Sequence, residues 1–171
     1  GKASSEVVGT IVSSLGSGGI SATEIGGALD KITAGAVDSL DQISGFSVSF
    51  LGDAIDNITG GATAALGDIS VTGFTSDNLS SMVEKVTAGA TSALGKISMT
   101  GYTSDNLSSM VERVTAGATG ALGKISMVDE DGGKFDASDL AGMVEKITAG
   151  ATSALGKISM VDEDGGKFDA S

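Results

Sequence analysis

The sequence predicts a mainly α protein, a solenoid-like array of amphipathic helices joined by short loops or small β-hairpins. Two observations carry this prediction. First, residues 79–99 read LSSMVEKVTAGATSALGKISM, and residues 107–127 and 140–160 repeat this text with few changes. Second, apolar residues within each copy recur at helical spacing. Repeats of this length indicate stacked units that bury one continuous core between neighbours.

More divergent copies extend the array toward the N-terminus. The first apolar residues of the five copies are Ile25, Leu51, Leu79, Leu107 and Leu140, which gives steps of 26, 28, 28 and 33 residues. The growth from 28 to 33 falls in the connector. We therefore expect a single repeat array over residues 1–171, with an N-terminal helix at about 5–16, units at about 20–45, 46–71, 72–99, 100–127 and 128–160, and an unfinished loop at 161–171.

The fourth copy shows why each unit is expected to be helical. Its apolar stripe consists of Leu107, Met110, Val111, Val114, Ala118, Ala121, Leu122 and Ile125, at offsets 0, 3, 4, 7, 11, 14, 15 and 18. This spacing is typical of an amphipathic helix, and period-two alternation fails over the same stretch. Three glycines lower the intrinsic helix stability by about 1 kcal/mol each. Packing must therefore hold the helix, and the small residues Ala116 to Ala121 let another backbone approach closely.

The ends of this helix also have sequence signals. Ser104, Asp105 and Asn106 are good N-cap and first-turn residues, and Lys124 is expected in the last turn, where a cation is favoured. The alternative is a helix broken near Ala116 and Gly117.

The connectors are expected to be short strand–turn–strand segments. Residues 97–99 alternate between apolar and polar, and Thr100-Gly101 suits a tight turn. A large apolar residue lies five positions before the first apolar residue of each helix, where it is expected to fill the gap between helices: Ile20, Phe46, Phe74, Tyr102 and Phe135.

Composition excludes several function classes. The net charge of −12 disfavours nucleic acid and anionic lipid as partners. The chain has no His and no Cys, so the usual general base, the thiolate nucleophile and the common transition-metal ligands are missing. Repeats also place the same groups everywhere, whereas catalysis needs one singular arrangement. We therefore expect that the protein is not an enzyme. The sequence has no run of 18 uncharged apolar residues, so no membrane-spanning segment is expected.

The insertion in the last connector carries recognisable chemistry. Residues 129–140 read DEDGGKFDASDL, and residues 162–171 read DEDGGKFDAS. This segment resembles the EF-hand calcium loop, and more closely its dockerin variant, in which Asp closes the loop. The likeness covers about twelve residues per copy. It departs from the pattern by lacking one residue between Asp131 and Gly133, where a third acidic ligand is usual.

The resemblance implies a role for each matching residue. Asp129 and Asp131 match the first two ligands, Gly133 the turn glycine, Lys134 a backbone carbonyl ligand, Phe135 the apolar residue, Asp136 the water-bridged position and Asp139 the terminal acid. In the second copy Asp162, Asp164 and Asp169 match ligand positions. Crowded hard oxygen ligands suit calcium better than a transition metal. The alternative is a solvated acidic turn in which the glycines only supply positive φ.

The function expected from these observations is structural. The segment 6–15 reads as a helix without a preceding loop, and 161–171 as a loop without a following helix, so copies are expected to join head to tail into a fibre or adhesive stalk. The alternative for these ends is a chain that stops within a longer protein. Weak calcium sites suit extracellular concentrations, so the expected location is the cell surface or outside the cell.

A binding module is the second functional hypothesis. Threonine pairs four residues apart mark an uncharged helix face: Thr59 and Thr63, Thr87 and Thr91, Thr115 and Thr119, Thr148 and Thr152. Such a ladder is expected either to face a partner protein or ice, or to pack against other helices of the array.

Overall fold

The computed structural model describes residues 10, 21–42, 47–68, 75–97, 103–125, 136–161 and 167–169. In this part of the chain five α-helices form a bundle: α2 (Ala22–Asp38), α3 (Val48–Ala65), α4 (Ser76–Leu94), α5 (Ser104–Leu122) and α6 (Ala137–Leu155). Single 3-10 turns, Ser39–Gln42 and Leu66–Asp68, extend α2 and α3. The α-helical class predicted from the repeats is thus confirmed.

The structure resolves the choice between one helix and two in each repeat. Helix α5 runs without interruption through Ala116 and Gly117, as the unbroken stripe predicts. It ends at Leu122 with Gly123 as its C-cap, so Lys124 lies past the helix and not in its last turn. The expected position of Lys124 is therefore wrong, because the apolar stripe continues beyond the helix to Ile125.

Each helix begins at a hydroxyl or carboxylate cap. In α5 the N-cap is Thr103, one residue before the predicted set, because its extended backbone (φ −112°, ψ 171°) marks the last non-helical residue. Its Oγ1 accepts a hydrogen bond from the Asn106 amide, and its own amide donates to Asn106 Oδ1 at 2.9 Å. Ser21 and Glu24 form the same capping box at α2. The Ser21 hydroxyl and, to a smaller extent, the Ser21 amide donate hydrogen bonds to the Glu24 carboxylate and lower its pKa.

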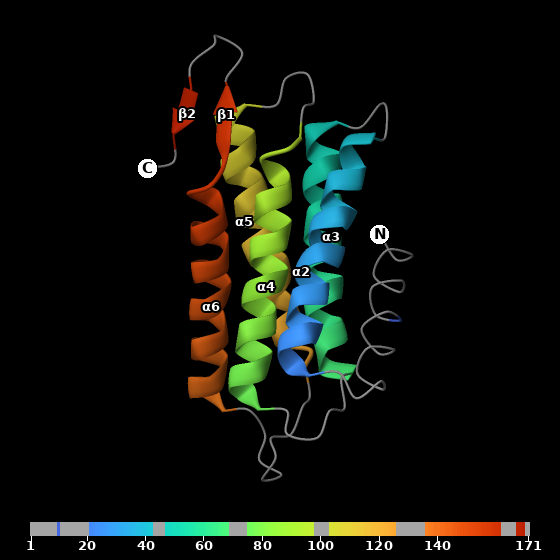
Figure 1. Ribbon diagram of the computed structural model, residues 1–171, viewed down its shortest axis with the longest axis vertical. Coiled ribbons are helices and arrows are strands. Elements are labelled where there is room, and N and C mark those ends of the chain that lie inside the picture. The colour runs from blue at the N-terminus through green and yellow to red at the C-terminus, as the bar shows by residue number, and fades with distance from the viewer. Residues whose placement is uncertain are drawn as a thin grey trace.

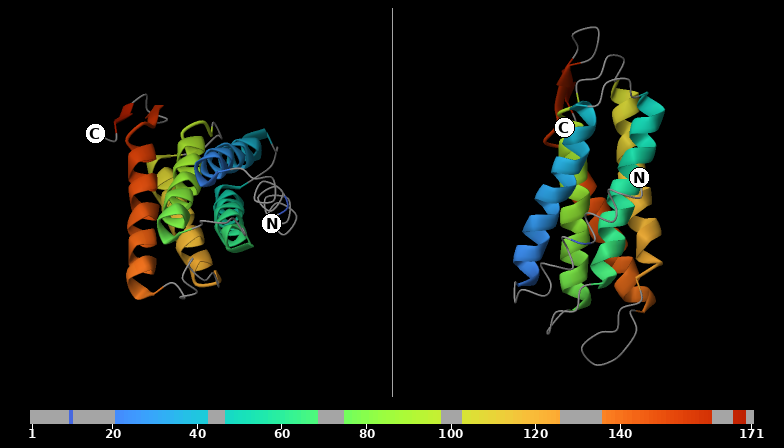
Figure 2. Two further views of the ribbon diagram at one scale, coloured as in Figure 1. Left: turned by 60° about the horizontal axis from the view of Figure 1, so that its bottom comes forward. Right: turned by 90° about the vertical axis from the view of Figure 1, so that its right-hand side faces the viewer.

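The helices lie in two layers, α2, α4 and α6 in one and α3 and α5 in the other (Figures 1 and 2). Consecutive helices run antiparallel, so alternate helices run parallel (Figure 1). The most extensive contacts join alternate helices: α2 with α4, α4 with α6, and α3 with α5. Consecutive helices meet only across the layers, with far fewer contacts.

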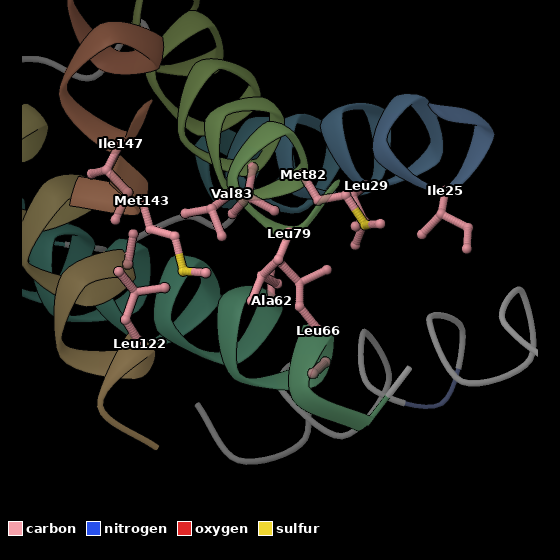
Figure 3. Packing of buried hydrophobic residues seen from close by; sticks show 13 residues of the cluster. Ile25, Leu29, Ala62, Leu66, Leu79, Met82, Val83, Leu122, Met143 and Ile147 are labelled. Carbon is pink, nitrogen blue, oxygen red and sulfur yellow. The ribbon is translucent and has the colours of Figure 1, made fainter. Parts of the chain in front are cut away.

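The apolar stripes meet between the two layers. Leu79, Met82 and Val83 of α4 cluster with Leu66, in the 3-10 turn after α3, and with Ile147 of α6 (Figure 3). A second cluster along the same layer boundary contains Leu51, Ile55, Leu94, Leu107 and Val114, all fully buried. This burial supplies the stabilisation that the glycine-rich helices lack on their own.

The connector after α6 is described in part. Strands β1 (Ser159–Val161) and β2 (Lys167–Asp169) pair antiparallel, with Met160 opposite Phe168. The other connectors, with Ile20, Phe46, Phe74, Tyr102 and Phe135, lie outside the described residues, as do the predicted N-terminal helix around 5–16 (apart from residue 10) and the turn at 162–166.

Within the described segments, no helix combines the length and the apolarity needed to cross a bilayer.

Replacing the N-cap tests the revised helix start. Thr103→Ala removes the Oγ1 acceptor of the Asn106 amide and is expected to lower the free energy of unfolding by about 1 kcal/mol in urea titrations. Ser104→Ala changes the first helical residue and is the control, with an expected loss near zero. An equal loss of unfolding free energy in the two variants would show that Thr103 is not the N-cap.

Candidate assembly interface

Alternate helices touch through one glycine contact that occurs three times. Gly89 of α4 lies on the backbone carbonyl of Asp30 in α2. A Cβ added at Gly117 of α5 would lie 2.6 Å from the Asp56 carbonyl oxygen of α3, and one at Gly150 of α6 would lie 2.5 Å from that of Glu84 in α4. Real Cβ atoms essentially never come this close, so no other residue fits without moving a backbone.

The three contacts share one register. Each glycine is the tenth residue after the first apolar residue of its own helix, and each acidic residue is the fifth after that of its partner. The sequence motif Thr-Ala-Gly-Ala around Gly89, Gly117 and Gly150 therefore forms one repeated interface. This explains why the helices keep glycine despite its cost of about 1 kcal/mol relative to alanine.

Each helix has two different sides in this interface. We call the side that bears the contact glycine the rear face; in α6 it includes Met143 and Gly150. We call the side that receives the next parallel helix the forward face. It is a ridge of residues four apart, and in α4 it consists of Leu79, Val83, Thr87 and Thr91, all fully buried.

The threonine pairs belong to this forward face. Thr59, Thr63, Thr87 and Thr91 are fully buried where α5 covers α3 and α6 covers α4. Of the two alternatives for the threonine ladder, packing within the array is therefore the one observed for α3 and α4. Thr87 Oγ1 donates to the Val83 carbonyl at 2.5 Å, whereas the hydroxyls of Thr59, Thr63 and Thr91 have no hydrogen-bond partner.

The forward face of α6 is uncovered. This face consists of Leu140, Val144, Thr148 and Thr152; Leu140 is 37% and Val144 39% exposed, and both threonines are exposed. The equivalent residues of α4 are fully buried. The same change begins on α5, where Thr119 is exposed. Helix α6 thus presents the surface that α4 buries, whereas on α5 this face is exposed only at Thr119.

Two ion pairs cross the interface in the same direction. Arg113 of α5 lies 3.2 Å from Asp53 of α3, and Lys146 of α6 lies 3.2 Å from Glu84 of α4. In both pairs the cation stands six residues after the first apolar residue of the later helix. The side chains are about half exposed, so each pair contributes at most about 1 kcal/mol. They set register more than stability.

The predicted calcium ligands are only partly described. Asp136 is the N-cap of α6, and its Oδ1 accepts from the amides of Ser138 and Asp139 at 2.7 and 3.0 Å. Asp139 Oδ2 accepts from the Asp136 amide at 2.9 Å. Both carboxylates thus cap the helix. Asp169 lies in β2, while Asp129, Asp131, Lys134, Asp162 and Asp164 lie outside the described residues.

Within the described part of the chain, no three acidic residues come together as a metal site. Calcium therefore stays a prediction that depends on the acidic loops.

A shallow groove of about 620 Å³ follows the glycine contact between α3 and α5. It is lined largely by small residues, among them Gly60, Gly117 and Gly120, with Asp56 and Lys124 at its sides. Most of its lining is backbone and small side chains, as expected where two helices pack closely.

The pairing of alternate helices was not foreseen from the sequence. Its signal is nevertheless present: threonines stand at fixed positions beside the apolar stripe, with a glycine between them that a solvent-facing helix would not need.

Two glycines of one helix allow the close contact to be tested. Gly117→Ala places a Cβ against the Asp56 carbonyl and is expected to destabilise the fold by about 1–3 kcal/mol. Gly120→Ala, where nothing lies within 4 Å, is the control and is expected to stabilise by up to about 1 kcal/mol. Chemical denaturation measures both, and a Gly117→Ala variant as stable as the control would disprove the contact.

The buried hydroxyls give a prediction of opposite sign. Position 37, equivalent to Thr91, is already valine in α2. Thr91→Val removes a buried hydroxyl without a partner and is expected to raise the free energy of unfolding by about 1 kcal/mol. Thr152→Val changes the exposed equivalent in α6 and is expected to stay within about 0.5 kcal/mol of the parent. Loss of stability in Thr91→Val would mean that the hydroxyl is satisfied.

Comparison of the chain with known protein families and with curated proteins finds no match.

Proposed function

We propose that this protein is a non-enzymatic structural repeat protein that assembles end to end with copies of itself into a fibre or stalk. The observation that carries the proposal is an interface that the described helices use three times in one register and that is open again at α6. Interfaces whose two sides differ generate open chains, because each added unit presents the side that was just covered.

Exposed apolar residues on the forward face of α6 support a role of this face in assembly. Leu140 and Val144 lie next to each other on one ridge. Burying them, as their equivalents in α4 are buried, would remove apolar surface from water and stabilise the assembly. Ala141, Thr148 and Thr152 lie on the same face and carry no charge, so the ridge itself requires no charge to be desolvated when a parallel helix covers it.

Calcium is proposed as a stabiliser of the joints near the C-terminal end. Asp129, Asp131, Asp136 and Asp139, with the Lys134 carbonyl, would hold one ion, and Asp162, Asp164 and Asp169 part of a second. The capping role of Asp136 and Asp139 is compatible with this, since an EF-hand-like loop also ends in a helix start. Sites of this kind suit an extracellular or cell-surface setting.

A binding module remains the second candidate function. Among the described helices, the exposed threonines of this face are Thr119 of α5 and Thr148 and Thr152 of α6, so a partner protein would bind there and not along a ladder of all helices. Burial of Thr59, Thr63, Thr87 and Thr91 leaves few threonines at the surface for contact with ice.

Assembly is tested by sedimentation and electron microscopy of the full chain over a range of protein and calcium concentrations. We expect a mass that rises with protein concentration and filaments or short rods, with calcium shifting assembly to lower protein concentration. The matched variant Asp129→Ala/Asp131→Ala is expected to assemble but to lose the calcium effect. A strictly monomeric particle under all conditions would contradict the structural function.

A further inference from the structure

We infer that the forward face of α6 binds the rear face of α2 from a second copy of the chain, with Gly35 of that copy on the backbone carbonyl of Glu145. This inference rests on the proposed function and names the surfaces that meet. It extends the interface between α4 and α6 by one helix in the same register.

The receiving surface is the forward face of α6 itself. Leu140 and Val144 are more than one-third exposed, and Ala141 beside them is exposed as well. In α4 the same three positions hold Leu79, Ser80 and Val83, which α6 buries. A helix seated on α6 as α6 is seated on α4 would therefore bury an apolar ridge that is now in water.

The inserting surface is the rear face of α2. Its contact glycine, Gly35, is exposed, and a Cβ added there would meet nothing within 4 Å. The equivalent glycines Gly89 and Gly150 are buried, each against a carbonyl of the preceding parallel helix. Gly35 thus lacks the carbonyl contact that Gly89, Gly117 and Gly150 make at the same position of their helices.

Register and charge agree with this pairing. Gly35 is the tenth residue after Ile25, and Glu145 the fifth after Leu140, which is the relation that joins Gly150 to Glu84. The same relation brings Lys31 of the second copy beside Glu145, as Lys146 lies beside Glu84 at 3.2 Å. Lys31 and Glu145 are both exposed in a single chain.

The geometry gives the assembly a direction. The rear face of α2 and the forward face of α6 lie at opposite ends of one layer (Figure 1), and each chain has one of each. When two copies bind, one still has a free α2 rear face and the other still has a free α6 forward face. Growth therefore continues beyond a dimer unless the rotation between successive copies closes a ring.

Gly35→Ala tests the inserting surface without harming the chain. The new methyl group enters open space within one copy, where alanine favours the helix, but it would meet the Glu145 carbonyl in the assembly. We expect self-association to weaken about 10- to 100-fold, measured by sedimentation equilibrium.

Gly27→Ala is the matched control on the same helix. Its equivalent in α6, Gly142, has nothing within 4 Å although α4 covers the rear face of α6, so this position lies outside the interface. Self-association of Gly27→Ala should equal that of the parent chain.

A mixing experiment tests both surfaces together. Val144→Gln makes the exposed ridge of α6 polar and should also weaken self-association, because Val144 occupies the position of the fully buried Val83. At a protein concentration at which the parent chain assembles and each variant alone is monomeric, an equimolar mixture of Val144→Gln with Gly35→Ala should form a one-to-one heterodimer and no longer species. That dimer pairs the intact α2 face of Val144→Gln with the intact α6 face of Gly35→Ala.

The outcomes separate this inference from the proposed function. If the parent chain assembles and Gly35→Ala assembles equally well, the pairing of α2 with α6 is wrong while a structural function stands. If the mixture forms no heterodimer, or each variant still polymerises, the pairing is also overturned. If the parent chain stays monomeric at every concentration, both proposals fail.

Discussion

The architecture depends on one constraint: a glycine Cα that must lie against a backbone carbonyl of the parallel neighbour. At Gly117 and Gly150 any side chain would come within 2.6 Å of that oxygen. Backbones this close bring the flanking side chains into dense packing. The glycine contact therefore fixes the spacing within a layer, and with it the ridge of residues that the next parallel helix buries.

Fold class and helix extent were predictable from the sequence because they depend on local spacing. The stripe from Leu107 to Leu122 has a single helical phase, and one helix forms there. The helix start was predicted one residue late, since Thr103, Ser104 and Asn106 are all acceptable near an N-cap and only backbone geometry separates them. Such ambiguity is inherent in runs of short polar residues.

The pairing of alternate helices, by contrast, depends on contacts between residues about sixty positions apart. Threonine at positions such as Thr87 is compatible with water or with a packed interface, and the repeat itself does not choose between them. For the calcium loop, sequence likeness indicates the ligand positions, while the described geometry shows only that Asp136 and Asp139 hold the start of α6. The proposed assembly surface rests on comparing exposure at equivalent positions, which requires coordinates.

The connectors are independent of the helix contacts. The pairs Asp30–Gly89, Asp56–Gly117 and Glu84–Gly150 are separated by 59, 61 and 66 residues, yet each makes the same contact. Extra length between helices thus leaves the contacts between the helices unchanged. An array of this kind can acquire new chemistry through the insertion of a few residues at a helix end. The connectors can therefore diversify in evolution while the helix contacts stay the same.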